Sequence, residues 1–197
     1  IRALLRELRQ VFSDFPDEKV IVFTEYLDTL AAIGEALDAD VEMAGCYVIL
    51  RGGLTPRQRL RRQAAFEQPG TRILLATDAA SEGLNLQRAC RRVIHIELPW
   101  NPNRLEQRNG RVDRYGQTRP PIIRYLFYPD SPEDDVLHRL VEKIERMAGD
   151  RISTPDILGV LSGMEELNRE LVSFDPEQGD VQRRKESLVR LFDDRTD

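Results

Sequence analysis

The segment from residue 107 to residue 117 reads Gln-Arg-Asn-Gly-Arg-Val-Asp-Arg-Tyr-Gly-Gln, and its residue types and spacing suit the binding of a polyanion. Gln107, Arg111 and Arg114 stand at i, i+4 and i+7, so a helical conformation would place them on one face. Arginine keeps its charge and offers a rigid fork of donors that matches phosphate oxygens. The segment predicts stabilisation of charge on a transferring phosphoryl group, and an arginine-rich surface helix is the alternative.

The residues at the start of this helix and the one glycine within it allow two further predictions. Asn101, Pro102 and Asn103 are typical of a helix start, and Asn103 has capping-box spacing to Glu106. A glycine inside a helix costs about 1 kcal/mol relative to alanine. Gly110 therefore predicts that another backbone, or a ligand, comes close at that position.

A second block, residues 74–87, reads Leu-Leu-Ala-Thr-Asp-Ala-Ala-Ser-Glu-Gly-Leu-Asn-Leu-Gln. Thr77 and Asp78 place a hydroxyl and a carboxylate at the end of an apolar strand. The small residues after them form a turn through which backbone amides can reach a phosphate. The first half of the block alone would suit many α/β enzymes.

Strands alternate with helices along the first 130 residues, which predicts an α/β fold with a parallel sheet. Short apolar runs are typical of buried parallel strands, and apolar residues at helical spacing indicate the helices between them. We expect strands at 20–23, 47–50, 72–77, 92–96 and 122–127, and helices over 2–12, 27–37, 56–66 (capped by Thr55) and from 102 onward, with a loop and a short helix over 79–90. In such folds ligands gather outside the carboxyl ends of the strands, where the polar residues of this sequence fall.

Residues 131–197 form an acidic extension with helical patterning and no motif of their own. We therefore divide the chain into a domain at 1–130 and a helical extension at 131–197, which packs on that domain or on a neighbouring one. The chain also divides into three charge blocks: residues 51–124 carry 15 arginines against 6 acidic residues, whereas the blocks on either side are acidic and the total is −5. An arginine excess across the chain could reflect genome composition, but that would not explain the clustering.

Composition excludes several other classes of protein. Hydrophobic residues make up 41% of 197 residues, as in an ordinary globular domain, and no apolar run reaches membrane-spanning length. The start lacks a signal-peptide pattern, so we expect a cytoplasmic protein without a membrane partner. Cys46 and Cys90 are isolated, which indicates neither zinc nor a disulfide framework. His95 and His138 are expected to be structural, and no metal site is predicted.

Taken together, these motifs resemble those of superfamily 2 helicases, and most specifically the Swi/Snf-type DNA translocases. The resemblance rests on Gly83-Leu84-Asn85-Leu86 in motif V, on Trp100-Asn101-Pro102, and on the motif VI segment that ends in Arg114, Gly116 and Gln117. Residues 20–25 resemble motif IV, and Gly52-Gly53-Leu54-Thr55-Pro56 with Arg59 and Phe66 resembles a further block. Leu98-Pro99 and Asp113 depart from the eukaryotic remodeller pattern. A bacterial relative, such as an RNA-polymerase-recycling ATPase or a phage-defence translocase, is closer.

The resemblance implies a RecA-like second motor lobe. The sequence has no GxxxxGK[ST] phosphate loop and no DExx box, so ATP with Mg²⁺ would be bound mainly by a first RecA-like lobe outside this sequence. By itself the chain is expected not to hydrolyse ATP. Arg111 and Arg114 would act as arginine fingers with Gln107 beside them. Glu82, Gly83 and Asn85 would lie near the nucleotide at the interface between the lobes.

The resemblance also implies that this lobe grips the backbone of duplex DNA. The nucleic-acid-binding residues carried over are Thr24, Arg51, Gly52, Gly53, Arg59 and Thr77. Contacts to phosphate carry no sequence information, which suits a motor that passes over any sequence. Simpler interpretations stay open: Thr77 as an ordinary strand-end hydroxyl, Trp100 as a packing anchor, and the arginines at 57, 61 and 62 as a solvated helix face.

Two other functions compete with the translocase. The first is a strand-separating DNA or RNA helicase that shares motifs V and VI, against which the GLNL and WNP strings weigh. The second is a non-catalytic nucleic-acid-binding scaffold, against which the intact Arg111 and Arg114 weigh. RNA polymerase or a defence-system subunit would be a partner of the whole protein.

Overall fold

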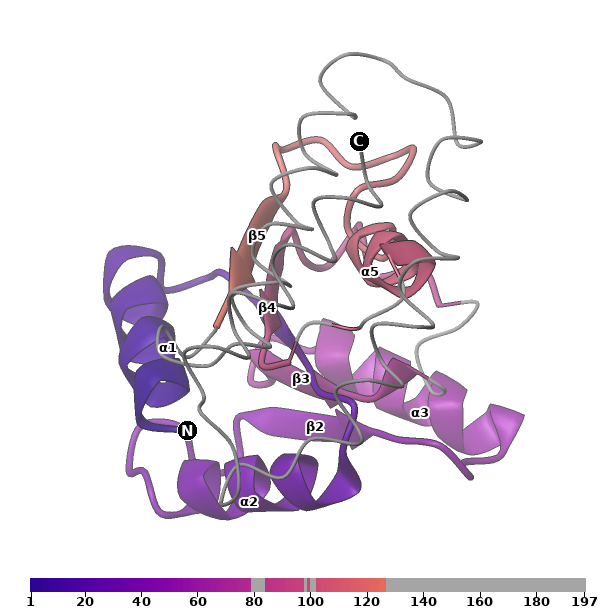
Figure 1. Ribbon diagram of the computed structural model, residues 1–197. Helices are drawn as coiled ribbons and strands as arrows, with labels where there is room; N and C mark the ends of the chain where they lie inside the picture. Colours follow the sequence, from indigo (N-terminus) through magenta and orange to yellow (C-terminus); the bar gives the residue numbers. More distant parts are fainter. Residues whose placement is uncertain (79–83, 98, 100–101, 127–197) are drawn as a thin grey trace, which may run out of the picture. The chain divides into compact units, whose positions relative to one another are not determined.

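The computed structural model describes residues 1–78, 84–97, 99 and 102–126 of the chain (Figure 1). The predicted helical extension at 131–197, Trp100 and His138 lie outside these residues. Part of the loop and short helix predicted over 79–90 does so as well.

A five-stranded parallel sheet forms the centre of the fold (Figure 1). Its strands are β1 (Val20–Phe23), β2 (Tyr47–Leu50), β3 (Ile73–Ala76), β4 (Arg92–His95) and β5 (Ile122–Tyr125). They lie in the order β2-β3-β1-β4-β5, with Val20 opposite both Ile73 and Arg92. Because all strands run the same way and end in register, their carboxyl ends meet at one edge. All five predicted strands and the α/β class are confirmed.

The four described helices are α1 (Arg2–Asp14), α2 (Leu27–Asp38), α3 (Pro56–Glu67) and α5 (Pro102–Asn109). Successive strand residues face opposite sides of the sheet, so each strand supplies two cores. Val20 and Val22 pack with α1 and α2, whereas Ile21 and Phe23 pack with Phe66 of α3 and with Leu84. Burial on both faces explains the continuously apolar strand sequences. The sheet is thereby fixed from both sides, which holds the loops at its carboxyl edge.

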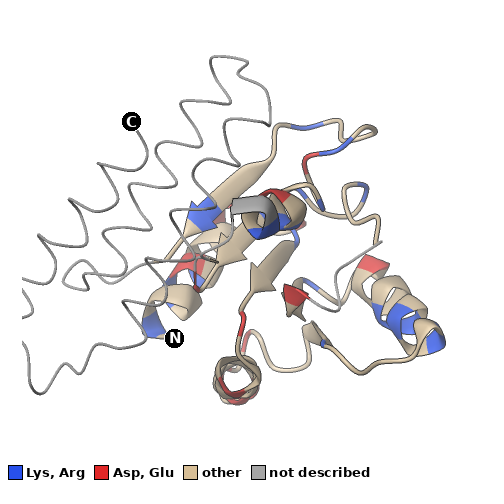
Figure 2. Ribbon diagram, turned by 45° about the vertical axis from the view of Figure 1, so that its right-hand side comes forward, with Lys and Arg blue, Asp and Glu red and all other residues tan. Residues whose placement is uncertain are grey.

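The start of α3 follows the sequence prediction in detail. The backbone N–H of Gln58 donates to the Thr55 hydroxyl oxygen at 3.3 Å, and the Thr55 N–H donates to the Gln58 side-chain oxygen at 2.8 Å. This is a complete capping box, with Pro56 in the first turn. The basic residues of α3 form a blue stripe along the helix in Figure 2, and Arg57, Arg61 and Arg62 are exposed.

The helix that begins at Pro102 is shorter than expected. It ends at Asn109, so Arg111 and Arg114 come after it in a succession of turns instead of sharing its face with Gln107. Gly110 follows the last residue of the helix, and a Cβ there would lie 3.1 Å from the carbonyl oxygen of Glu106, so the backbone leaves little room for a side chain. The close backbone that the glycine predicts is thus the preceding turn of its own helix. No ligand is needed to account for Gly110.

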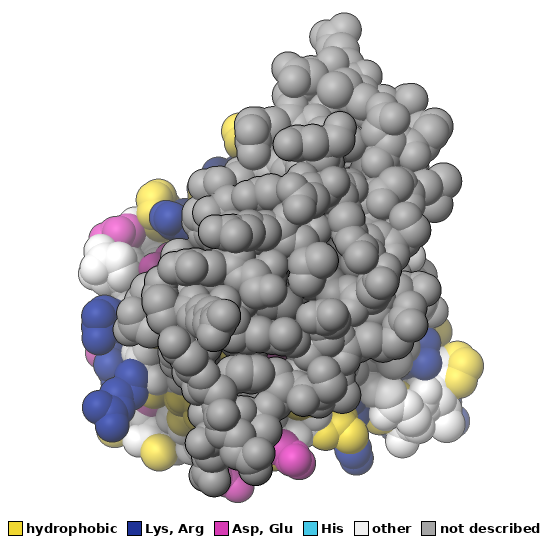
Figure 3. Space-filling view, in the orientation of Figure 1, with side chains coloured by type: hydrophobic (Ala, Val, Ile, Leu, Met, Phe, Trp, Pro, Cys, Tyr) yellow, Lys and Arg dark blue, Asp and Glu magenta, His cyan; other side chains and the backbone are white. Residues whose placement is uncertain are grey.

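Around the edge of the face in Figure 3, basic, acidic and hydrophobic side chains are mixed. The most exposed large apolar residues, Val41, Leu60 and Tyr115, belong to three separate parts of the chain. Single exposed apolar side chains are normal on a protein surface. Within the described ranges, no helix is long and apolar enough to cross a bilayer, and no three potential metal ligands cluster.

Candidate functional site

A cleft of about 580 Å³ opens at the carboxyl edge of the sheet. Its lining comes from the loops after β1, β2 and β3 and from α5: Glu25, Tyr26, Leu27, Gly52, Thr77, Asp78, Arg104 and Gln107. Three of the residues singled out from the sequence, Gly52, Thr77 and Gln107, are therefore brought to one place. The parallel register is the reason, because it ends the three strands at the same level.

The glycine loop after β2 presents backbone to this cleft. Gly52 lines the cleft, and Gly53 has a φ of +80°, a conformation that residues with a side chain rarely adopt. Arg51 is exposed beside them. Arg59, on α3, is half-buried, and its Nε atom is enclosed without a hydrogen-bond partner. The loop can thus offer amides and a guanidinium to an anion.

The two threonines differ in how they are placed. Thr77 is 6% exposed, lines the cleft, and donates its N–H to the Leu50 carbonyl at 3.0 Å. Thr24 is 1% exposed, and its hydroxyl oxygen accepts the Tyr26 N–H at 3.3 Å within the turn from β1 to α2. The Thr24 side chain therefore stabilises that turn, and only Thr77 lines the cleft.

Arg108, which the sequence analysis did not single out, lies at the centre of the polar contacts beside the cleft. Its side chain is 1% exposed, yet it carries a charge. Nε and Nη2 donate to the two carboxylate oxygens of Asp78, the latter at 3.0 Å, and Nη1 donates to the Glu97 carbonyl at 3.0 Å. The Glu25 carboxylate lies 3.6 Å from Nη2. One guanidinium therefore joins the loops after β1, β3 and β4 to α5.

His95 lies beneath this guanidinium at the end of β4. It is wholly buried, stacks between the rings of Phe23 and Tyr125, and shares a 2.9 Å hydrogen bond with the Asn109 side-chain oxygen. Burial, and then the charge of Arg108, lower the pKa of His95 to about 3. The imidazole is therefore neutral at physiological pH, which agrees with the structural role expected for it.

Two carboxylates, those of Glu25 and Asp78, lie close to two guanidiniums on one side of the cleft. Burial raises the pKa of Glu25, while the Arg108 charge acts in the opposite direction and Asp78 in the same one. Arg104 is exposed and lies 3.8 Å from the Glu25 carboxylate and 3.9 Å from that of Asp78. The carboxylates here are thus balanced by two arginines of α5.

Arg111 and Arg114, the two predicted arginine fingers, contact Leu84 and Asn85, which come later in the chain than β3. Arg111 donates from Nη1 to the Leu84 carbonyl at 3.3 Å and from Nε to the Gln107 carbonyl at 3.0 Å. Exposed Arg114 donates from Nη1 to the Asn85 side-chain oxygen at 2.8 Å. The structure thus brings Arg111, Arg114 and Asn85 together, and these three hydrogen bonds go to neutral oxygens. Glu82 and Gly83 lie outside the described residues.

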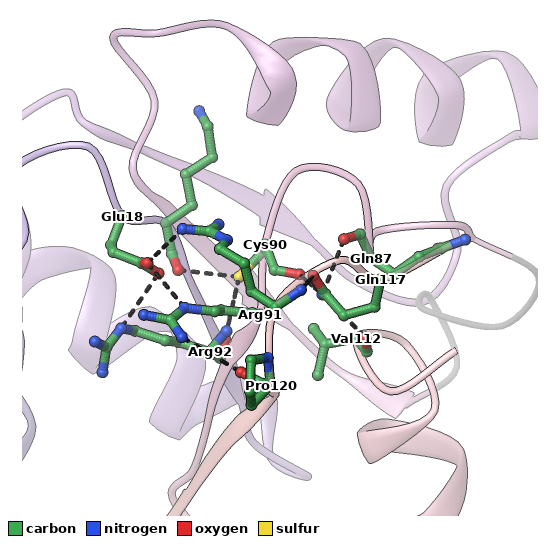
Figure 4. Close-up of polar contacts among 10 residues, drawn as sticks. Glu18, Gln87, Cys90, Arg91, Arg92, Val112, Gln117 and Pro120 are labelled. Carbon is green, nitrogen blue, oxygen red and sulfur yellow. Dashed lines mark hydrogen bonds and ion pairs between the residues drawn. The ribbon is translucent and has the colours of Figure 1, made fainter. Parts of the chain in front are cut away.

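The amino edge of the sheet holds a second charged cluster (Figure 4). Glu18 is 5% exposed and accepts from Arg91 at 2.9 Å, Arg92 at 3.3 Å and Arg119 at 2.7 Å. Cys90 lies beside it, and burial raises the pKa of its thiol to about 12, so it is protonated and unreactive near pH 7.

Gln117, the last residue of the arginine-rich motif, belongs to this amino edge. Its side-chain Nε2 lies 2.9 Å from the Gln87 carbonyl, 3.0 Å from that of Cys90 and 3.2 Å from that of Val112 (Figure 4). One amide therefore fastens the turn after α5 to the loop before β4. The side chain of Gln117 therefore has a structural role, because it donates to backbone carbonyls.

Comparison with known protein families matches residues 2–116 to the helicase conserved C-terminal domain. The chain is 37% identical over 137 residues to the uncharacterized ATP-dependent helicase YqhH of Bacillus subtilis, a match that covers 68% of this chain and 24% of YqhH. It is 36% identical over 116 residues to the RNA polymerase-associated protein RapA of Actinobacillus succinogenes, which covers 59% of this chain and 12% of RapA. The chain thus spans a quarter or less of the length of these relatives.

Solved structures agree with these relatives. The C-terminal part of the Fun30 ATPase domain superposes with a TM-score of 0.63 and 26% identity, over 71% of this chain and 44% of that one. The Escherichia coli DEAD-box protein SrmB gives 0.53 with 22% identity, over 68% of this chain and 72% of that one, which supports the fold alone.

Proposed function

The chain belongs to the helicase C-terminal domain family of superfamily 2, in its Snf2-like branch, and from this premise we propose that it is the second motor lobe of an ATP-driven duplex-DNA translocase. One observation carries the proposal. A single stretch, α5 and the turns after it, contributes Gln107 to the cleft and then places Arg111 and Arg114 beside Leu84 and Asn85. This one short element would then connect the cleft that binds nucleic acid with the arginines that contact the phosphates of ATP.

Arg111 and Arg114 are the residues we assign to the nucleotide, with Glu82, Gly83 and Asn85 beside them. The sequence predicts the same role for Gln107, but Gln107 lines the cleft that we assign to nucleic acid, so its contact with the nucleotide stays a prediction. ATP with Mg²⁺, bound mainly by the first lobe, supplies the phosphoryl group. The two guanidiniums only donate hydrogen bonds, which fits them to phosphate oxygens. Arg114 is exposed and donates to a neutral amide oxygen, so exchanging that contact for a charged phosphate oxygen is favourable.

The strand of nucleic acid is assigned to the glycine loop and to the cleft beside it. Amides at Gly52 and Gly53, the Thr77 hydroxyl, and the guanidiniums of Arg51 and Arg59 are all groups that bind phosphate without reading a base. Thr24 stays a weaker prediction because its hydroxyl is used within a turn. The RapA relatives carry the name RNA polymerase-associated, which makes RNA polymerase the first protein partner to test.

The deciding experiment measures ATP hydrolysis by the full-length protein with no nucleic acid, duplex DNA, single-stranded DNA or RNA. We expect stimulation by duplex DNA and a loss on the order of 10³ in kcat for Arg114→Ala. Arg124→Ala, an exposed arginine paired with Glu7 at 3.4 Å, is the matched control and should hydrolyse normally.

Two outcomes would replace the proposal. Preferential stimulation by single strands or RNA, with separation of a duplex, would identify a strand-separating helicase. DNA binding with hydrolysis indifferent to Arg114→Ala would identify a non-catalytic scaffold.

A further inference from the structure

We propose that Arg108 is a positioning residue that couples occupation of the cleft to the two arginines after α5. The inference rests on the proposed function, because it assigns a role within the same motor lobe. Arg108 itself is 1% exposed and touches neither the solvent nor a predicted ligand position. It can act only through the residues that it holds.

The contacts of Arg108 form a closed ring at the carboxyl edge of the sheet. Its guanidinium binds both oxygens of Asp78 and the carbonyl of Glu97. The Glu97 side chain in turn accepts the Glu25 N–H at 3.2 Å, and the Glu25 carboxylate returns to within 3.6 Å of Arg108. The three loops after β1, β3 and β4 are therefore tied to α5 by one side chain.

Two members of this ring, Glu25 and Asp78, line the cleft, and Asp78 directly follows Thr77. A phosphate that binds at Thr77 and Gly52 brings negative charge next to these carboxylates. The Glu25 and Asp78 side chains are only 21% and 26% exposed, so solvent screens this repulsion incompletely, and the carboxylates and their shared arginine must readjust. Arg108 would respond to the nucleic acid without touching it.

The same stretch of chain holds both ends of the segment from residue 78 to residue 85. Arg108 binds Asp78 at its start, whereas Arg111 and Arg114 bind Leu84 and Asn85 at its end. The Arg108 carbonyl accepts the Arg111 N–H at 3.1 Å, so a shift of Arg108 together with Asp78 moves the start of the turns that carry the two later arginines. This gives a continuous physical path from the cleft to the proposed fingers.

Lysine cannot replace Arg108 in this arrangement. A guanidinium binds a carboxylate through two parallel hydrogen bonds and still has a third direction for the Glu97 carbonyl, whereas an ammonium is a point charge. Arg108→Lys keeps the buried positive charge, so the carboxylates are not left unpaired, but it loses the two-pronged geometry. The substitution therefore tests position and not charge.

The test uses the full-length protein and compares ATP hydrolysis with and without duplex DNA. For Arg108→Lys we expect the DNA-stimulated kcat to fall about tenfold, while the basal kcat and the KM for ATP stay within about twofold. Arg9→Lys is the matched control, because exposed Arg9 pairs with the Asp40 carboxylate at 2.6 Å and neither residue lines the cleft, so its stimulation should be unchanged.

Undiminished stimulation in Arg108→Lys would overturn the inference, as would a parallel fall of basal and stimulated rates with a lowered melting temperature. If Arg108→Lys does not fold, Asp78→Asn is the second variant: it keeps the shape of the partner and should reduce the ratio of stimulated to basal rate. An unchanged ratio there also overturns the inference. A wild-type protein that duplex DNA does not stimulate would instead sink the proposed function itself.

Discussion

Each of the two edges of the sheet buries one charged side chain among side chains of the opposite charge. The central group is a carboxylate at the amino edge and a guanidinium at the carboxyl edge. At the amino edge one carboxylate, Glu18, meets three arginines, and at the carboxyl edge one arginine, Arg108, meets the carboxylates of Asp78 and Glu25. Both central groups are almost wholly buried. Only the second cluster has members that line the cleft at the carboxyl edge. Charge pairing alone thus says little about function, whereas pairing beside a cleft is informative.

Glu18→Gln should have the largest effect on stability, because it leaves three neighbouring guanidiniums without their shared carboxylate. We expect a loss of about 3 kcal/mol in the free energy of unfolding of the chain. Urea denaturation measures it. Glu7→Gln removes the half-buried partner of exposed Arg124 and should cost less than about 0.5 kcal/mol.

Duplex-DNA affinity per folded molecule should be unchanged in Glu18→Gln. Weaker duplex-DNA binding by the folded variant would contradict the view that the cluster around Glu18 is structural and that DNA binding depends on the carboxyl edge.

Acid should destabilise the carboxyl edge through His95. Its pKa is depressed to about 3 in the folded state, so below pH 6.5 the unfolded chain binds a proton that the folded chain does not. Stability is then complete above about pH 6.5 and falls as pH falls, by about 2 kcal/mol between pH 7 and pH 5. Urea denaturation at several pH values checks this, and His95→Gln should flatten the dependence by about that amount. An equally steep slope in the variant would remove His95 as the cause.

Of these substitutions, apart from the controls, Gly53→Ala should have the smallest effect on stability. It tests whether position 53 needs a glycine because of its positive φ. At a φ of +80° a Cβ is strained even though nothing lies within 4 Å of it, so we expect a loss of about 1 kcal/mol in stability. Gly70 is equally open but has no positive φ, so Gly70→Ala is the control and should change stability little. Equal losses measured by thermal unfolding would exclude backbone strain as the reason for a glycine at position 53.

The sequence predicts the fold well where the signal is local. A run such as residues 20–23 is buried on both faces, so its apolar character alone identifies the strand, and the Thr55 cap depends on a residue three positions away. The end of α5 was missed because Gly110 was interpreted as a close approach inside a longer helix, although glycine also commonly follows the last residue of a helix. Arg108 was missed because its partners lie in three other loops. Nothing in one sequence shows that Arg92 and Arg108 are the buried ones among the 15 clustered arginines.

Gln117 sets a limit on how the lobe can work. Its amide anchors the backbone three residues beyond Arg114, and three residues span at most roughly 10 Å. Arg114 is therefore held within a short radius and cannot travel far by loop rearrangement. Under the proposed function, Arg114 would therefore meet a phosphate through a movement of whole domains and not through a rearrangement of its own loop.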